Sequence, residues 1–180
     1  MSSVLKDLLP DWGNETSNMG GIAQIGYIIA VRNITTWSAP AANSTGSNKF
    51  LHTIAFVPKV DEGFLKFYCT PEIGEFDMAA IGARDGGGFD GSVKIFIPGN
   101  DKELNYVANV CRSDVFVALI PDNDGTLNQL GTQHHFVFIK LDYKTGPITT
   151  EHGRGYFGEL MVKQPFKILY TGAVTLKPTE

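Results

Sequence analysis

The sequence predicts an all-β fold, a β-sandwich or barrel-like arrangement of about eight strands with one short α-helix packed on it. Three observations predict this class. Short apolar runs rich in β-branched and aromatic residues recur along the chain, and glycine or proline separates them. Only one segment has the periodicity of an amphipathic helix. The chain of 180 residues has 20 glycines and 12 phenylalanines and is long enough for one domain with a substantial core.

The chain is predicted to have three parts. Residues 1–21 are expected to form an N-terminal arm, 22–172 a single β-sandwich domain, and 173–180 a polar C-terminal tail. Residues 38–50 are small and polar, which predicts an extended surface loop. The N-terminus has no basic region, and no apolar run approaches the length of a membrane span, so synthesis and residence in a cytoplasm are expected.

A long hairpin is the most distinctive predicted element. Polar and apolar residues alternate in 72–81 and again in 92–97, which predicts two antiparallel strands, each buried on one face. The glycine-rich residues 82–91 between them predict a long loop, because glycine releases the backbone from steric limits and aspartate can bond to nearby amides.

Further strands are expected on both sides of this hairpin. The predicted ranges are 22–34, 52–57, 64–70, 115–120, 127–130, 134–143, 154–162 and 165–170. Residues 122–125 (DNDG) predict a tight turn in which Gly125 supplies the positive φ.

The one predicted helix covers residues 100–112. Asn100 or Asp101 can cap its first turn, and Arg112 suits the negative end of the helix dipole. An apolar stripe is formed by Leu104, Val107, Ala108 and Cys111. This stripe is expected to lie on a sheet.

Chemical motifs are weak throughout the sequence. Gly86, Gly88 and Gly91 match G-x-G-x-x-G, but a strand and not a helix is predicted to follow, so no dinucleotide site is expected. The DNDG turn lacks the glycine and glutamate positions of a calcium loop. His134 and His135 would point to opposite faces of a strand. The sequence therefore predicts no catalytic residue, no cofactor and no metal site.

The acidic group around Glu75 and Asp77 leaves an alternative open. Two carboxylates on one strand face would suit glycoside hydrolysis, although a solvated strand face is the simpler interpretation. Cys69 and Cys111 are far apart in sequence and are expected to be free buried thiols. The net charge of −4 argues against a protein that binds nucleic acid over its whole surface.

The order of these elements resembles the tail tube (major tail) proteins of tailed bacteriophages. The resemblance rests on the long hairpin EIGEFDMAAIGARDGGGFDGSVKIFIPG, the helix DKELNYVANVCRS, the strand VFVALIPDNDG and the closing segment ELMVKQPFKILYTG. The opening NMGGI also looks like the start of such proteins. The resemblance covers roughly residues 18–172.

This resemblance implies a structural virion protein and not an enzyme. It implies a ring, usually a hexamer, made by sheets that continue from subunit to subunit, and rings that stack into a tube through which double-stranded DNA passes without specific binding. The implied partners are copies of the chain and other phage tail proteins, with no membrane. Assembly would take place in the cytoplasm of a bacterial host, and the final location would be the virion tail.

The resemblance also assigns roles to particular residues. Glu75, Asp77 and Lys94 would face the lumen, and acidic side chains there would repel phosphates. A loop contacting the neighbouring ring would contain Asp85, Gly86, Gly87, Gly88 and Asp90.

Two other functions remain open at this point. A tail-completion or tail-barrel ring of a short-tailed phage would use the same fold once instead of repeatedly. A carbohydrate-binding β-sandwich would need an exposed aromatic platform, for which Trp12, Trp37 and Tyr27 are the candidates.

Overall fold

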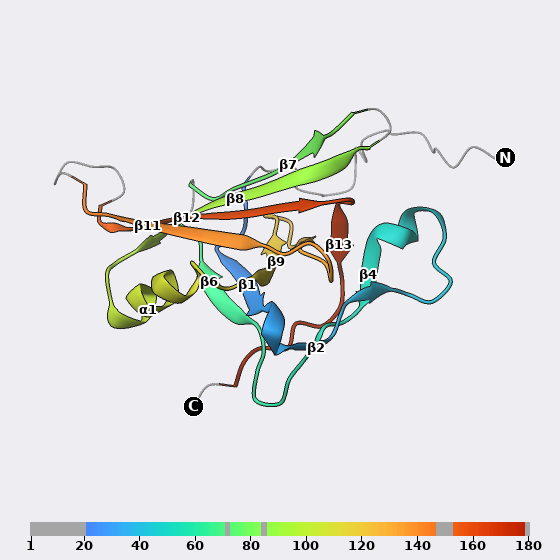
Figure 1. Cartoon of the computed structure of the whole chain (residues 1–180), viewed down its shortest axis with the longest axis horizontal. Coiled ribbons are helices and arrows are strands. Elements are labelled where there is room, and N and C mark those ends of the chain that lie inside the picture. The colour runs from blue at the N-terminus through green and yellow to red at the C-terminus, as the bar shows by residue number, and fades with distance from the viewer. Residues whose placement is uncertain (1–20, 71–72, 84–85, 147–152, 179–180) are drawn as a thin grey trace.

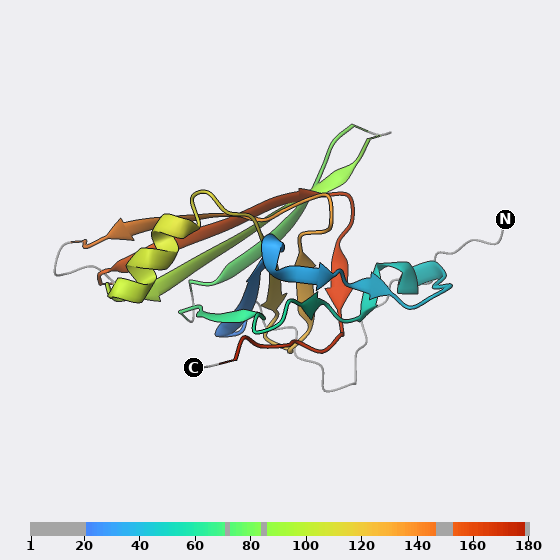
Figure 2. The same cartoon turned by 60° about the horizontal axis from the view of Figure 1, so that its bottom comes forward.

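The computed structural model describes residues 21–70, 73–83, 86–146 and 153–178. It is an all-β fold with one short helix, as predicted, and its two main sheets stack as layers (Figures 1 and 2). The expected N-terminal arm lies outside the described residues. Thirteen strands occur in the described residues instead of about eight, in part because the predicted strands 22–34 and 52–57 are each divided in two and because a short strand (Ala39–Pro40) lies within the predicted loop 38–50.

The larger sheet has seven strands. Every neighbouring pair is antiparallel except β13 and β4, which are parallel. In spatial order the strands are β3 (Ala39–Pro40), β4 (Leu51–Ile54), β13 (Ile168–Tyr170), β10 (Leu127–Leu130), β9 (Phe116–Pro121), β1 (Ile25–Ala30) and β6 (Leu65–Tyr68).

The smaller sheet has four strands, all antiparallel to their neighbours. In spatial order they are β11 (Phe138–Lys144), β12 (Gly155–Gln164), β8 (Gly88–Pro98) and β7 (Glu75–Ile81). A separate ribbon pairs β2 (Ile34–Thr36) with β5 (Val57–Pro58). The predicted strand 22–34 is divided by a 3-10 turn, η1 (Val31–Asn33).

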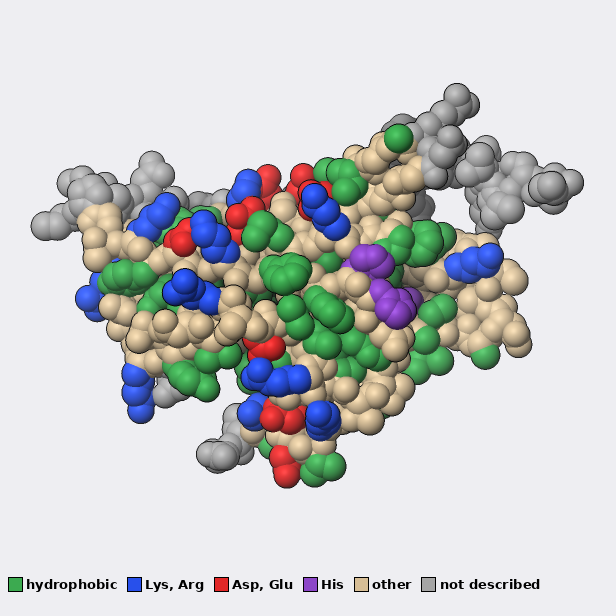
Figure 3. Space-filling view, viewed as in Figure 1, with side chains coloured by type: hydrophobic (Ala, Val, Ile, Leu, Met, Phe, Trp, Pro, Cys, Tyr) green, Lys and Arg blue, Asp and Glu red, His purple; other side chains and the backbone are tan. Residues whose placement is uncertain are grey.

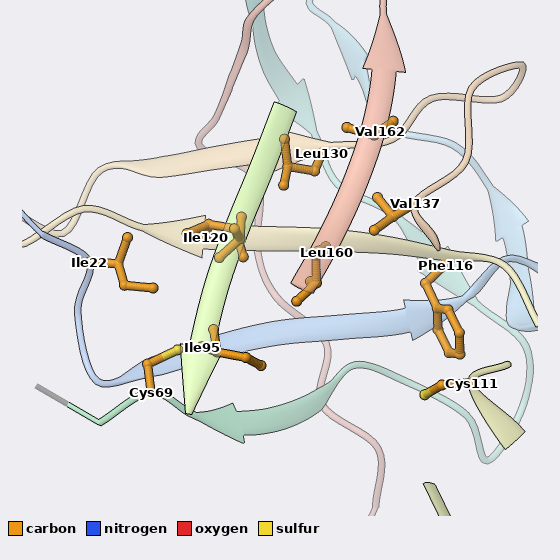
Figure 4. Packing of buried hydrophobic residues seen from close by; sticks show 12 residues of the cluster. Ile22, Cys69, Ile95, Cys111, Phe116, Ile120, Leu130, Val137, Leu160 and Val162 are labelled. Atoms are coloured by element: carbon orange, nitrogen blue, oxygen red, sulfur yellow. The ribbon is translucent and has the colours of Figure 1, made fainter. Parts of the chain in front are cut away.

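The main core lies between the two sheets. Side chains from both inner faces interdigitate there, as expected for a sandwich (Figure 4). Its fully or nearly buried members include Val93, Ile95, Ala118, Ile120, Leu130, Val137, Leu160 and Val162. The predicted buried thiols are confirmed, because Cys69 and Cys111 are both free and both lie in this core.

A second core covers the opposite face of the seven-stranded sheet. Alternate residues of β9, Val117 and Leu119, point into it and pack with Phe56, Phe64 and Tyr170. The hydroxyl of Tyr170 donates to the carbonyl of Ala173 at 2.8 Å and accepts from the Phe56 N–H at 3.3 Å. This pair of hydrogen bonds fixes the chain after the last strand.

The described part of the predicted tail belongs to the fold. Leu176 pairs in parallel with Phe64, where the Phe64 N–H donates to the Thr175 carbonyl and the Lys177 N–H donates to the Phe64 carbonyl. Val174 packs against the second core. Residues through Lys177 therefore help to close the sandwich.

The helix α1 (Lys102–Val110) is confirmed. Its cap is Asp101, whose side chain accepts from the Leu104 N–H at 2.8 Å. The apolar stripe is covered only in part, because Cys111 is buried in the main core but Val107 is 41% exposed. The helix lies beside one end of the four-stranded sheet and does not lie flat on it (Figures 1 and 2).

We expect Gly158→Ala to destabilise the fold. A Cβ at this position would lie 2.6 Å from Ile95 Cγ1 and 2.8 Å from Leu141 Cδ2, inside the main core. The overpacking should reduce the free energy of unfolding by about 1–3 kcal/mol. Urea denaturation measures this change.

Gly86→Ala is the matched control, because a Cβ at Gly86 would meet nothing within 4 Å. Its effect should stay within about 1 kcal/mol. Equal stability of the two variants would contradict the packing described around Gly158.

Candidate functional site

The outward face of the four-stranded sheet gathers most of the predicted site residues, and we call it the charged face. Residues of β7, β8, β12 and β11 alternate between the core and this face. Its charged members are Glu75, Asp77, Asp90, Lys94, Lys140, Asp142, Lys144, Glu159 and Lys163. Figure 3 shows acidic and basic side chains intermingled over the upper part of the molecule, where this sheet lies.

Opposite charges alternate across all four strands in one row. The strand registers place Glu75 beside Lys94, Lys94 beside Glu159, and Glu159 beside Lys140. Lys94 Nζ donates to Glu75 Oε2 at 2.8 Å, and this hydrogen bond is the main reason why the pKa of Lys94 is raised. Neighbouring strands thus present no like-charge pair along this row.

The other lysines of the charged face also have partners within it. Lys140 Nζ lies 3.0 Å from Asp142 Oδ2, and Lys163 Nζ lies 3.9 Å from Asp90 Oδ2. Lys144 Nζ lies over the ring of Phe157, 5.0 Å from its centroid. Exposed ion pairs of this kind add little to the stability of the fold. In total, the charged face has four lysines and five carboxylates, so its charges nearly cancel.

The structure therefore corrects one expectation about Glu75 and Asp77. Both lie on one exposed strand face, as the alternation predicted, and Lys94 of the neighbouring strand lies on the same face of the sheet. The face is not strongly acidic, however, because lysines from β8, β12 and β11 interleave with the carboxylates. The sequence pattern of β7 alone could not reveal the lysines of β11 and β12, which lie more than 60 residues later in the chain.

The charged face is hollowed at one end. A trough of about 870 Å³ crosses the four strands between the end of β7 and the segment before β11. Apolar side chains of Ile81, Phe138 and Met161 share its walls with Asp77 and Lys163. The charged face is thus hollowed at this end, and the hollow is open to solvent.

Both lateral edges of the four-stranded sheet are free in the described residues. β7 pairs only with β8, and β11 pairs only with β12. Each of these edge strands has seven residues. A free edge presents unpaired N–H and C=O groups that another strand can bind.

The predicted inter-ring loop is shorter than expected. Asp85 lies outside the described residues, while Gly86 and Gly87 lie in the connection between β7 and β8. Gly88 and Asp90 are not loop residues, because β8 begins at Gly88 and Asp90 pairs with Ala79 and with Lys163. Pairing with strands on both sides overrides the turn preference of this glycine-rich segment.

Residues 38–50 contain more structure than the predicted loop. Besides β3, they include η2 (Gly46–Phe50), a 3-10 helix that projects from the body in Figures 1 and 2. The rings of Phe50 and Phe166 meet with 5.1 Å between centroids, although both side chains are about half exposed. This aromatic pair holds the projecting segment to the residues just before β13.

A buried polar network lies away from the charged face. Ser38 Oγ donates to Gln129 Oε1 at 2.8 Å, and Gln129 Nε2 donates to the Gly131 carbonyl at 2.9 Å. Ser38 Oγ also lies 2.9 Å from His52 Nδ1. Since the hydroxyl proton is committed to Gln129, His52 must be the donor in that contact. His52 therefore does not act as a base toward Ser38, as a nucleophilic serine would require.

The aromatic platform of a carbohydrate-binding module is not formed by Trp37. Its ring packs edge-on against Phe56, with 5.9 Å between centroids, and stacks on Phe136 at 6.4 Å. Tyr27 packs against the second core, and Trp12 lies outside the described residues. Trp37 and Tyr27 are therefore engaged within the fold.

Within the described residues, no three His, Cys, Asp or Glu side chains are grouped closely enough to hold a metal ion. No helix in that part of the chain combines the length and apolarity needed to cross a membrane.

We expect stability to fall on acidification because of His52. Burial lowers the pKa of His52 below 6.5, and a hydrogen bond with Gln129 opposes that shift only in part. The unfolded chain then binds a proton near pH 6.5 that the folded chain does not, so the free energy of unfolding decreases as the pH falls below this value. His52→Gln should flatten the decrease, as urea denaturation between about pH 5 and 8 can measure.

His134→Gln is the control, because His134 is exposed. It should keep the acid-side loss of stability seen in the wild type. A His52→Gln profile that coincides with the wild-type profile would contradict the burial effect.

Comparisons with models of protein families, with curated proteins and with solved structures find no match to this chain. No family is therefore shown, and the candidate site rests on geometry. The surface that combines most of the predicted residues with two open strand edges is the charged face.

Proposed function

We propose that the chain is a ring-forming structural subunit of a bacteriophage tail tube, with the charged face turned toward a channel through which DNA passes. The observation that carries the proposal is a four-stranded antiparallel sheet with a charge-compensated face, hollowed at one end, and two edges of seven residues each that are free in the described residues. Its partners would be further copies of the chain, other tail proteins and passing DNA. Its place would be the virion tail, after assembly in the host cytoplasm.

The strand directions suit closure into a ring. Because all four strands alternate in direction, rotation about an axis brings β11 of one copy antiparallel to β7 of the next. One repeated contact then joins every copy to its neighbours, and closure removes the free edges that favour uncontrolled association.

The dimensions suit a channel for DNA. Six copies, as the resemblance implies, contribute about 24 strands to a closed barrel at about 4.8 Å per strand. With a strand tilt of about 35°, the backbone diameter is about 45 Å, which leaves room for a duplex inside the side chains.

The charge arrangement suits passage without adhesion. DNA binding draws on lysine and arginine side chains that replace counterions at phosphates. The lysines of the charged face are already engaged with carboxylates or with an aromatic ring of the same face. Carboxylates interleaved with them oppose a close approach of phosphate.

The projecting segments suit contacts between rings. The connection with Gly86 and Gly87 and the η2 segment both project at the same end of the molecule in Figures 1 and 2. Strands that run along the tube, apart from their tilt, direct such an end toward the next ring. We assign inter-ring contact to these two segments.

Negative-stain electron microscopy over a concentration series tests the proposal. We expect rings with an open centre, stacked into tubes at high concentration. Single rings that never stack would instead favour the one-ring role in a short tail. A chain that stays monomeric at every concentration, and also with purified tail proteins added, would contradict ring formation.

We expect the double variant Glu75→Gln/Asp142→Asn to make assembled rings bind DNA. The change removes the ion-pair partners of Lys94 and Lys140 and takes two negative charges from the charged face. Filter binding of a duplex should rise at low salt and fall steeply as salt increases.

The matched control removes two carboxylates elsewhere. Glu62 pairs with Lys177 and Asp114 pairs with Arg32, both outside the four-stranded sheet. Glu62→Gln/Asp114→Asn gives the same change in net charge and should leave DNA binding at the wild-type level. Equal binding by both variants would mean that the charged face is not the surface that meets DNA.

A further inference from the structure

We propose a specific register for the contact between copies: β11 pairs with β7 of the next copy so that Phe138 faces Ile81 and Lys144 faces Glu75. This inference rests on the ring proposed above and names the residues that join it. The partner is a second copy of this chain, bound by continuation of the four-stranded sheet. Each copy supplies one edge at each junction.

The alternation of side chains restricts the possible registers. Outward residues are odd-numbered in β7 (Glu75 to Ile81) and even-numbered in β11 (Phe138 to Lys144). A continuous charged face requires outward residues to pair with outward residues, because a slip by one residue would turn the core side chains outward. Acceptable registers therefore differ in steps of two residues.

The proposed register uses the whole of both edges. All seven residues of β7 face all seven of β11, whereas a slip by two residues in either direction leaves five pairs. On the core side, the apolar pairs are Tyr143 with Phe76, Leu141 with Met78, and Ile139 with Ala80. Full overlap gives the largest number of backbone hydrogen bonds.

Two exposed apolar side chains also become partners in this register. Phe138 is 58% exposed and Ile81 is 38% exposed, and both line the trough on the charged face. Placed directly opposite each other across the junction, an aromatic and a β-branched side chain form a favourable cross-strand pair. A slip by two residues places Phe138 against Ala79 instead.

The strand tilt gives an independent argument. Within one copy, the row from Glu75 ends at Lys140, and in the proposed register Lys140 faces Ala79 of the next copy. On passing four strands, from one copy to the next, the row therefore shifts along β7 by four residues, from Glu75 to Ala79. With about 3.3 Å per residue and about 4.8 Å per strand, this slope corresponds to a tilt of about 35°.

That tilt is at the lower end of the 35–45° found in closed barrels, whatever the number of copies. A register slipped toward Ala79 facing Phe138 climbs two residues per copy and gives a tilt of about 19°. Charge does not separate these two registers, since each creates one attractive and one repulsive pair. Overlap and tilt together reject this slip. The opposite slip, with Lys144 facing Asp77, climbs six residues per copy and gives a tilt of about 46°, so overlap rejects that one, because it leaves five pairs instead of seven.

Disulfide crosslinking tests this register, with pairs of cysteines introduced into the otherwise wild-type chain and oxidised after assembly. Phe138→Cys/Ile81→Cys should form intermolecular disulfides in most chains on mild oxidation, and a ladder of covalent multimers should appear on a denaturing gel. Opposed residues have Cα atoms about 4.5–5.5 Å apart, within disulfide range. Within one copy, β7 and β11 are separated by two strands, so the bond must join two copies.

Phe138→Cys/Ala79→Cys is the control, because diagonal positions lie about 7–8 Å apart. It should remain monomeric on the gel. The native thiols give little background, since Cys69 and Cys111 are buried and burial is the main cause that raises their pKa values to about 12 and about 11. A second comparison uses the opposite end of the same two strands. Lys144→Cys/Glu75→Cys should crosslink, because these residues face each other, and Asp142→Cys/Glu75→Cys is its diagonal control.

The outcomes separate the register from the ring. Rings seen by microscopy together with crosslinking only in the two control variants would overturn the register and leave the proposed function standing. Rings with no crosslink in any variant would show that these edges do not meet. Wild-type chains that form no rings, and variants that form no crosslinks, would overturn both proposals.

Discussion

The structure depends on the burial of β9 from both sides. Its six residues are all buried, and they alternate between the core that separates the sheets and the second core beneath the seven-stranded sheet. A strand of this kind must be covered by two layers, which explains why the chain needs both the four-stranded sheet and the β2–β5 ribbon with the C-terminal segment. The four-stranded sheet is therefore held by one face only, and its other face is left to solvent.

This division of the faces determines what the exposed surface can do. Core packing fixes the inner residues of β7, β8, β12 and β11, while the outer residues are free to carry charge. Each lysine of that face has a partner close by on the same sheet. In a closed ring, such a surface has many charges but little net attraction for a polyanion, and this combination suits a conduit better than a binding site.

Local pattern was enough to predict the fold class, the helix with Asn100 or Asp101 as its cap, the β9–β10 turn and the shared face of Glu75 and Asp77. It failed where distant strands decide the outcome. Gly88 to Asp90 were expected in a loop, but the pairing of β8 with β7 and β12 makes them strand residues. His134 to Val137 were expected to belong to the strand that ends at Tyr143, but β11 begins only at Phe138. Val137 instead forms an isolated bridge with Phe116 of the other sheet. Three of the four lysines that neutralise the face come from β12 and β11, which no local window around β7 contains.

The order of strands in the chain also governs when a subunit becomes able to join others. β12 lies between β8 and β11 in space but follows β11 in sequence, so neither the charged face nor the spacing of the two free edges exists until Gln164 has been synthesised. The second core waits longer still, for Tyr170 and the pairing of Leu176 with Phe64. A chain still on the ribosome thus lacks the complete four-stranded sheet, and in the proposed ring it could not yet offer both edges to its neighbours.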